Sequence, residues 1–193
     1  MTISRDRPAD PYFFGYGSLV NRRTHDFPDA RPARAIGWRR VWRHTTRRQA
    51  AFLSVEPAPD QAIDGLVAAV PGGDWAALDL REAAYDRLPL RDVTHDLPVP
   101  AEVHIYRTSP AFAAPVAEHP ILLSYLDCVL QGFLHVFGPA GADAFIATTD
   151  GWETPILNDR ARPQYARHVD LSAAERTFID DRLARLPAPL RTP

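Results

Sequence analysis

The sequence predicts an α+β fold. Short β-like runs separated by Gly and Pro fill the first half of the chain, and longer helical patterns fill the second half. The length of 193 residues and the hydrophobic fraction of 46% suit one domain with a substantial core. We therefore expect a loose polar arm at residues 1–11, followed by a single domain over residues 12–193.

The first half is expected to consist mainly of strands. Residues 12–17 read as the first strand, and residues 33–45 read as a second strand or a twisted pair. Two shorter runs, residues 50–55 and 63–70, flank a link with two prolines that favours a turn. We expect these two runs to form a hairpin.

Helices are expected from residue 75 onwards. Asp74 is a good N-cap for a helix over residues 75–87, and a further strand is expected at residues 98–107. The last helix opens with Ser172 and Glu175, which have the spacing of a capping box. The later helices are expected at residues 121–137, 142–148 and 172–186, with a break at residues 138–141.

The composition excludes several classes of function. A net charge of −2 provides no overall field that would recruit nucleic acid or an anionic membrane. No apolar run has the roughly 18 residues of a membrane helix, and no signal-type apolar segment follows Met1. Cys128 is the single cysteine, so a reducing cytoplasm is the expected compartment. Because lysine is absent, Schiff-base chemistry and a Walker A loop are excluded.

An arginine-rich stretch also carries Trp38 and Trp42. Mixed basic and aromatic residues can bind single-stranded nucleic acid, but the chain is slightly acidic and has no nucleic-acid motif. We therefore interpret the stretch as a solvated strand face and expect no nucleic-acid partner. Its arginines are Arg31, Arg34, Arg39, Arg40, Arg43, Arg47 and Arg48.

The histidines do not indicate a metal site. All seven are scattered, and none forms the H-x-x-x-H or H-E-x-x-H spacing of a zinc site. Ser18 does not lie in the G-x-S-x-G elbow of a hydrolase nucleophile. We therefore expect no metal site.

The most informative stretch of the chain reads Phe14-Gly15-Tyr16-Gly17-Ser18-Leu19-Val20. Two glycines surround a tyrosine directly after an apolar run, which is typical of a strand that ends in a tight turn. Glycine permits positive φ and close approach of the backbone to a ligand. Such a turn can present consecutive N–H groups to a carboxylate or an oxyanion, although it could equally be only a structural turn.

Glu82 is the candidate acid or base. On a helix over residues 75–87, it shares one face with Leu78 and Tyr85. A carboxyl group on an apolar face is partly desolvated, which raises its pKa towards neutrality. The alternative is an ordinary surface glutamate that pairs with Arg81 or Arg87.

Two further segments could reach such a site. Ser124 and Tyr125 open the helical block at residues 121–137 and could point inward. The segment Asn158-Asp159-Arg160 could line a pocket or could pair its own charges as a linker.

The two main motifs together resemble the gamma-glutamylcyclotransferase superfamily. Gly15-Tyr16-Gly17-Ser18-Leu19 is similar to its substrate loop, and Leu78-Asp79-Leu80-Arg81-Glu82-Ala83-Ala84-Tyr85 is similar to the segment with its glutamate. The resemblance continues through residues 124–127 and 151–165, which look like a bacterial branch. It implies a small mixed β-barrel with surrounding helices.

The resemblance also implies a reaction. A γ-glutamyl amine or peptide would cyclise to 5-oxoproline and release its amine, with Glu82 as general acid/base and no cofactor. The implied substrate-binding residues are Tyr16, Gly17, Ser18, Leu19, Tyr85 and Tyr125. Glutathione, γ-glutamyl amino acids, γ-glutamyl polyamines and antibiotic intermediates share the same γ-glutamyl half, so the substrate stays open, as does the oligomeric state. The alternative is a non-catalytic γ-glutamyl or amino-acid binding module on the same fold.

Overall fold

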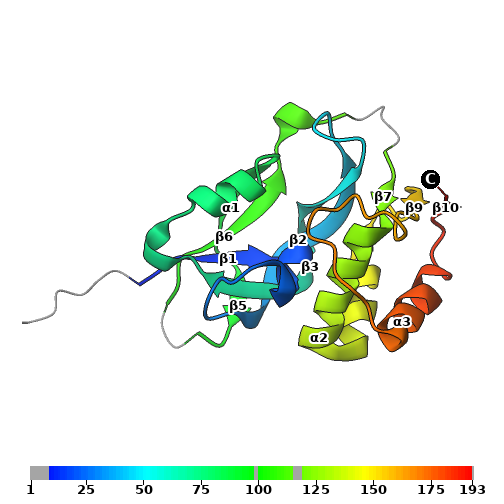
Figure 1. Ribbon diagram of the computed structural model, residues 1–193. Coiled ribbons are helices and arrows are strands. Elements are labelled where there is room, and N and C mark those ends of the chain that lie inside the picture. Colours follow the sequence, from blue (N-terminus) through cyan, green and yellow to red (C-terminus); the bar gives the residue numbers. More distant parts are fainter. Residues whose placement is uncertain (1–8, 98–99, 115–118, 193) are drawn as a thin grey trace, which may run out of the picture.

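The computed structural model describes residues 9–97, 100–114 and 119–192, and it has the mixed α+β architecture that the sequence predicts (Figure 1). Residues 1–8 of the expected N-terminal arm and the start of the expected strand at residues 98–107 lie outside the described residues. The strands are β1 (Tyr12–Gly15), β2 (Arg31–His44), β3 (Ala51–Ala69), β4 (Tyr85–Leu90), β5 (Val93–His95), β6 (Val103–Thr108), β7 (Ile121–Leu122), β8 (Thr149–Asp150), β9 (Ile156–Leu157) and β10 (Leu190–Arg191). The α-helices are α1 (Ala76–Arg81), α2 (Leu123–Ala147) and α3 (Ala173–Leu183), and the short 3₁₀ helices are η1 (Ser18–Val20), η2 (Arg22–Thr24), η3 (Pro71–Gly73) and η4 (Pro110–Phe112).

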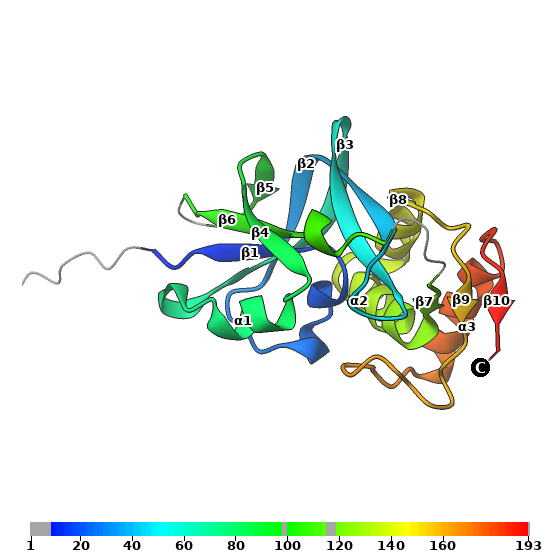
Figure 2. The ribbon, with the colours of Figure 1, turned by 90° about the horizontal axis from the view of Figure 1, so that it is seen from above.

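A mixed sheet of seven strands curls into a half-barrel, with strand order β4-β6-β1-β3-β2-β5 and β8 paired to β2. β1 runs parallel to β6 and antiparallel to β3, so the loop that leaves β1 starts inside the sheet. A second, smaller sheet joins β7, β9 and β10 at the other end of the molecule, beside α3 (Figure 2).

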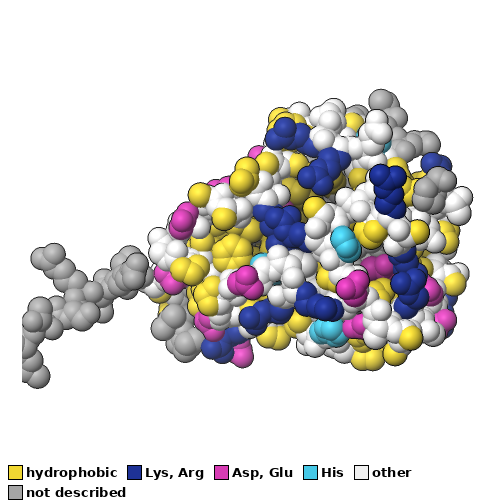
Figure 3. Space-filling model, viewed as in Figure 1, with side chains coloured by type: hydrophobic (Ala, Val, Ile, Leu, Met, Phe, Trp, Pro, Cys, Tyr) yellow, Lys and Arg dark blue, Asp and Glu magenta, His cyan; other side chains and the backbone are white. Residues whose placement is uncertain are grey.

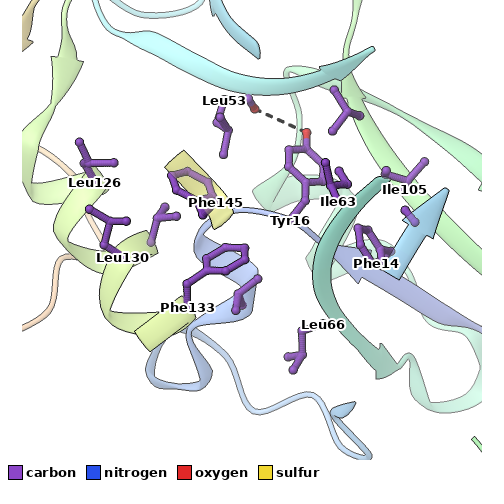
Figure 4. Close-up of a cluster of buried hydrophobic side chains, with 14 of the residues drawn as sticks. Phe14, Tyr16, Leu53, Ile63, Leu66, Ile105, Leu126, Leu130, Phe133 and Phe145 are labelled. Carbon is purple, nitrogen blue, oxygen red and sulfur yellow. Dashed lines mark hydrogen bonds between the residues drawn. The ribbon is translucent and has the colours of Figure 1, made fainter. Parts of the chain in front are cut away.

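Two clusters of buried hydrophobic side chains form the core, one on each face of the sheet at β1. Phe13 points to a cluster with Leu78 of α1, whereas Phe14 points to the larger cluster that contains Phe133 and Phe145 of α2 (Figure 4). This alternation follows from the two-residue period of a strand. As a result, α1 and α2 lie on opposite sides of β1, and the loop after β1 lies between them. Among the described residues, no helix is long and apolar enough to cross a membrane.

The expected hairpin between residues 50–55 and 63–70 is wrong. Both runs belong to β3, and both pair with β2, which is long enough to cover them in turn. The register shifts between Ile36 and Trp38, where Gly37 has a φ of 81° and residues 58–61 have no partner in the ladder. Pro59 lies among these unpaired residues and Pro57 is the last paired residue before them, so the prolines of the link mark an irregularity within one long ribbon.

The expected helix over residues 75–87 ends early, at Arg81. From Tyr85 onwards the chain pairs with β6 as β4, and this long-range pairing overrides the local helical pattern. Leu78, Glu82 and Tyr85 therefore do not share a helix face.

The second half agrees more closely with the sequence. A kink at Gly138, with a φ of 70°, divides α2 where the break was expected, and Pro139 restarts the helix. The capping box of α3 is present, because Ser172 Oγ accepts from the Glu175 N–H and the Glu175 carboxylate accepts from the Ser172 N–H.

The interpretation of the arginine-rich strand as a solvated face is wrong for Arg40, which is completely buried. Neighbouring residues of a strand point to opposite faces, so Arg39 and Arg40 cannot both face solvent. The Arg40 guanidinium donates to Thr148 Oγ1 at 2.7 Å and to the carbonyl of Asp64, and its Cζ lies 5.0 Å from the centres of the Phe133 and Phe145 rings. Burial lowers the pKa of Arg40 to about 9, so the group stays charged at neutral pH.

Candidate active site

The segment after β1 forms the first wall of the site. Gly17 is the N-cap of η1, and the N–H groups of Gly17, Ser18 and Leu19 donate to no acceptor among the described residues. Free N–H groups are expected at the first turn of a helix. They are available to an anionic group of a ligand.

Gly17 is required for space, and its backbone does not use positive φ. Its φ is −135°. A Cβ at this position would lie 2.7 Å from the hydroxyl oxygen of Tyr125 and 2.9 Å from Leu53 Cδ2. Only glycine lets the tyrosine of α2 lie directly against this backbone.

Tyr16 anchors the loop to the core. Its buried hydroxyl donates to the carbonyl of Tyr106 at 2.7 Å, and its own carbonyl accepts from Nε of Arg40 at 2.9 Å. Because its hydroxyl proton is donated to Tyr106, the Tyr16 side chain is held in place by the core. Leu19 packs with Leu78 in the cluster under α1, so its side chain is also part of the core.

Glu82 lies at the C-terminal end of α1 and faces the loop. Its side chain is only 14% exposed, and its Oε1 lies 3.2 Å from Nε of Arg81. Burial raises the pKa of Glu82 above its ordinary value, although the charges of Arg81 and Arg167 oppose this shift. A carboxyl group in such a setting can exchange a proton closer to neutral pH than an exposed glutamate can.

Arg81 connects Glu82 to the loop. Its Nη1 donates to the carbonyl of Thr24 at 3.0 Å, and its Nη2 donates to Ser18 Oγ at 3.2 Å. The Arg81 side chain is only 8% exposed, so these contacts are shielded from water. They fix the end of α1 and the start of η1 in one arrangement.

A cavity of about 360 Å³ opens over Glu82, within the size range of small-molecule sites. A narrow recess of about 30 Å³, lined by residues 14–19, shares walls with the cavity. Ser18, Leu53, Glu82, Tyr85 and Tyr125 line both spaces.

Three tyrosines enclose the carboxyl group. The Tyr85 hydroxyl donates to the carbonyl of Leu53 at 2.9 Å, and the Tyr125 ring meets the Tyr165 ring edge-on at 5.0 Å. Burial raises the pKa of Tyr85, Tyr125 and Tyr165, so all three hydroxyls are neutral at physiological pH. They shield Glu82 without adding charge.

We compared the chain with known proteins to identify its fold. No family model and no curated protein matches the chain. A solved gamma-glutamyl cyclotransferase aligns at 13% identity with a TM-score of 0.56, over 89% of this chain and 99% of its own. The chain has the gamma-glutamyl cyclotransferase fold. An uncharacterized human protein aligns with a TM-score of 0.57 at 13% identity, over 89% of this chain and 99% of its own. YkqA from Bacillus subtilis also aligns with a TM-score of 0.57, at 16% identity over 74% of this chain and 56% of its own.

Within the cyclotransferase fold, the two sequence motifs meet at one cavity. Ser18, Glu82, Tyr85 and Tyr125 line it, whereas Tyr16, Gly17 and Leu19 line the recess. Glu82 does pair with Arg81, but it is not the surface glutamate of the alternative interpretation. Arg87 pairs with Asp79 instead. Among the described residues, no group of three or more His, Cys, Asp or Glu side chains is placed to hold a metal ion.

Sequence reasoning missed several residues of the cavity. Tyr165 and Arg167 line it from the segment after β9, shown in orange in Figure 1, and Arg47 lines it from the β2–β3 turn. Arg81 was considered only as a pairing partner, although it stands next to Glu82 in the motif.

The segment around Tyr165 is fixed by Asp159. This buried carboxylate accepts from the N–H and the Oγ of Ser124, at 2.8 and 2.6 Å, and from the N–H of Gln164 at 2.9 Å. Ser124 Oγ in turn accepts from the N–H of Tyr165. Ser124 and Asp159 therefore lie behind the cavity wall and hold Tyr165 in place.

Proposed function

We propose that this protein is a gamma-glutamylcyclotransferase-type enzyme. It converts a γ-glutamyl amine or peptide to 5-oxoproline and a free amine. The observation that carries this proposal is the position of Glu82, a desolvated carboxyl group that shares a cavity wall with the free N–H groups of the loop after β1.

The reaction suits a site with one acid/base residue. The substrate contains its own nucleophile, because its α-amine attacks its own γ-carbonyl carbon to close the pyrrolidone ring. The protein needs to hold the substrate in the folded conformer, which can lower a barrier by roughly 7–11 kcal/mol in favourable cases. The cavity walls from α1, α2 and the β1 loop serve this purpose.

Glu82 moves the proton. At neutral pH the α-amine is an ammonium group, and the Glu82 carboxylate removes a proton from it so that the nitrogen can attack. As the C–N bond to the leaving group breaks, the Glu82 carboxyl returns a proton to the leaving nitrogen. The released amine regains the protons that the α-nitrogen loses, so the overall reaction needs no external proton donor.

The loop stabilises negative charge in this scheme. The N–H groups of Gly17, Ser18 and Leu19 would bind the α-carboxylate or the oxyanion that forms at the γ-carbonyl. Arg81 keeps Ser18 and Glu82 together, so that the loop and the base act on the same substrate.

Glu82→Gln tests the proposal. We expect the rate of 5-oxoproline formation from a panel of γ-glutamyl compounds to fall by about 10²–10⁴-fold, because the amide cannot transfer the proton. The matched control is Glu153→Gln, an exposed glutamate outside the cavity, which should keep full activity.

Two results would contradict the proposal. If Glu82→Gln keeps activity within a few-fold of the wild type, Glu82 is not the acid/base. If the wild-type protein binds γ-glutamyl compounds in calorimetry but releases no 5-oxoproline from any of them, the protein is a binding module instead.

A further inference from the structure

The cavity walls carry an excess of positive charge. Arg47, Arg48, Arg81 and Arg167 line the cavity, and Glu82 is the single acidic residue among its lining residues. Figure 3 shows arginine side chains in dark blue on the face between α1 and the later part of the chain. A γ-glutamyl group carries one carboxylate and one ammonium, so by itself it does not balance this charge.

Three of these arginines form no salt bridge, although the charge of Arg167 also acts on Glu82. Arg81 pairs with Glu82, but Arg47, Arg48 and Arg167 form no salt bridge with any described residue. Their charges therefore remain available to a ligand.

Arg47 is also held in a fixed position. Its Nη2 donates to the carbonyl of Ala83 at 3.1 Å, and its Cζ lies 4.2 Å from the centre of the Phe112 ring. A guanidinium that is already positioned loses less conformational entropy when it binds an anion.

These arginines lie where the leaving amine of the substrate would bind. The loop residues 16–19 line the recess beside Glu82, where the α-carboxylate or the γ-carbonyl oxygen of the γ-glutamyl half would bind, but none of the three arginines without a salt bridge lines that recess. They line only the larger cavity, together with Glu82. The amine that leaves would therefore extend towards Arg47, Arg48 and Arg167.

We propose that Arg47, Arg48 and Arg167 form a binding subsite for a carboxylate on the amine half of the substrate. This inference rests on the proposed function and deepens it. The protein then selects γ-glutamyl compounds whose leaving amine carries a negative charge, and it disfavours those whose leaving amine carries a second ammonium group, such as γ-glutamyl diamines.

Three compounds with leaving groups of similar size test this selectivity: γ-glutamylglycine, γ-glutamylglycinamide and γ-glutamylethylenediamine. The value of kcat/KM for 5-oxoproline formation by the wild type should be highest for the first compound and lowest for the third. The affinities, measured by calorimetry on the Glu82→Gln protein, should follow the same order. We expect the carboxylate to be favoured about tenfold over the neutral amide, and the preference should weaken at high salt.

Substitution identifies the residues responsible. Arg167→Gln and Arg47→Gln should each lower the preference for γ-glutamylglycine over its amide by about threefold or more, and this ratio is taken within each variant, so that a change in Glu82 affects both compounds alike. Arg162→Gln is the matched control, because Arg162 is exposed on the same segment as Arg167 but does not line the cavity.

The subsite and the proposed reaction can fail separately. Equal affinities for the three compounds, a preference for the diamine compound, or no binding of any of them would overturn the subsite. The absence of 5-oxoproline from all three, despite binding in the expected order, would overturn the reaction and leave the carboxylate subsite supported.

Discussion

Gly17→Ala is expected to disturb the site mainly through a contact with Tyr125. The added methyl carbon would lie 2.7 Å from the Tyr125 hydroxyl oxygen, but 3.9 Å from Cζ of the same ring. Ordinary contact begins at about 3.4 Å, so the hydroxyl would have to retreat by roughly 0.7 Å (3.4 − 2.7). The ring has little room, because it packs edge-on against Tyr165 and Trp42.

The magnitude follows from this crowding. Overpacking of this kind costs about 1–3 kcal/mol of unfolding free energy. Tyr125→Phe removes the crowding oxygen and leaves the new methyl at an ordinary distance from Cζ, while Leu53 Cδ2 can move at the end of its flexible side chain. The Gly17→Ala/Tyr125→Phe double variant should therefore recover about 1 kcal/mol relative to the sum of the single variants.

Urea unfolding of the wild type, both single variants and the double variant measures this coupling. In activity assays, Gly17→Ala should also raise KM, because the displaced ring narrows the recess beside the loop. If the two effects on stability add to within about 0.5 kcal/mol, the methyl group does not meet the hydroxyl and the close approach is incorrect.

Two further predictions concern the buried carboxylates. Burial raises the pKa of Glu82, so ionisation of this carboxyl group destabilises the folded state above that pKa. Glu82→Gln should therefore increase the unfolding free energy at neutral pH. This gain should vanish below the ordinary glutamate pKa, where Glu82 is protonated in both the folded and the unfolded protein. Denaturant titrations at neutral pH and near pH 3.5 measure this difference, and an equal difference at both pH values would disprove the linkage. Asp159→Ala leaves the Ser124 and Gln164 donors unsatisfied and should cost about 2–4 kcal/mol. Asp143→Ala, which removes an exposed pair with Arg182, should cost less than about 1 kcal/mol, and a comparable loss in both variants would argue against a special role for Asp159.

The sequence was informative where short segments determine the outcome. The capping box at Ser172 and the kink at Gly138 depend on local backbone chemistry, and both were found where they were expected. The two motifs around Gly17 and Glu82 were assigned to one site by resemblance, and the structure brings them to one cavity.

The elements that were predicted wrongly depend on pairing between strands that are distant in the sequence. The pattern at residues 82–87 is helical in isolation, and only the ladder with β6 makes Tyr85 part of a strand. The same holds for the two halves of β3, which pair with β2 over its whole length. Tyr165 and Arg167 approach Glu82 only because the segment after β9 passes beside the cavity, and no local pattern encodes that path.

The buried Arg40 has a consequence for how the protein acquires its site during synthesis. Its guanidinium connects the carbonyl of Tyr16, the carbonyl of Asp64 and the hydroxyl of Thr148, which come from three distant parts of the chain. Until residue 148 has left the ribosome, the guanidinium lacks one of its partners and, for most of that time, the two aromatic rings of α2 that it contacts, so burial of its charge is unfavourable. The strands that precede α2 therefore emerge before the contacts that hold the loop after β1 can form, and this order delays formation of the cavity until α2 and Thr148 have been translated.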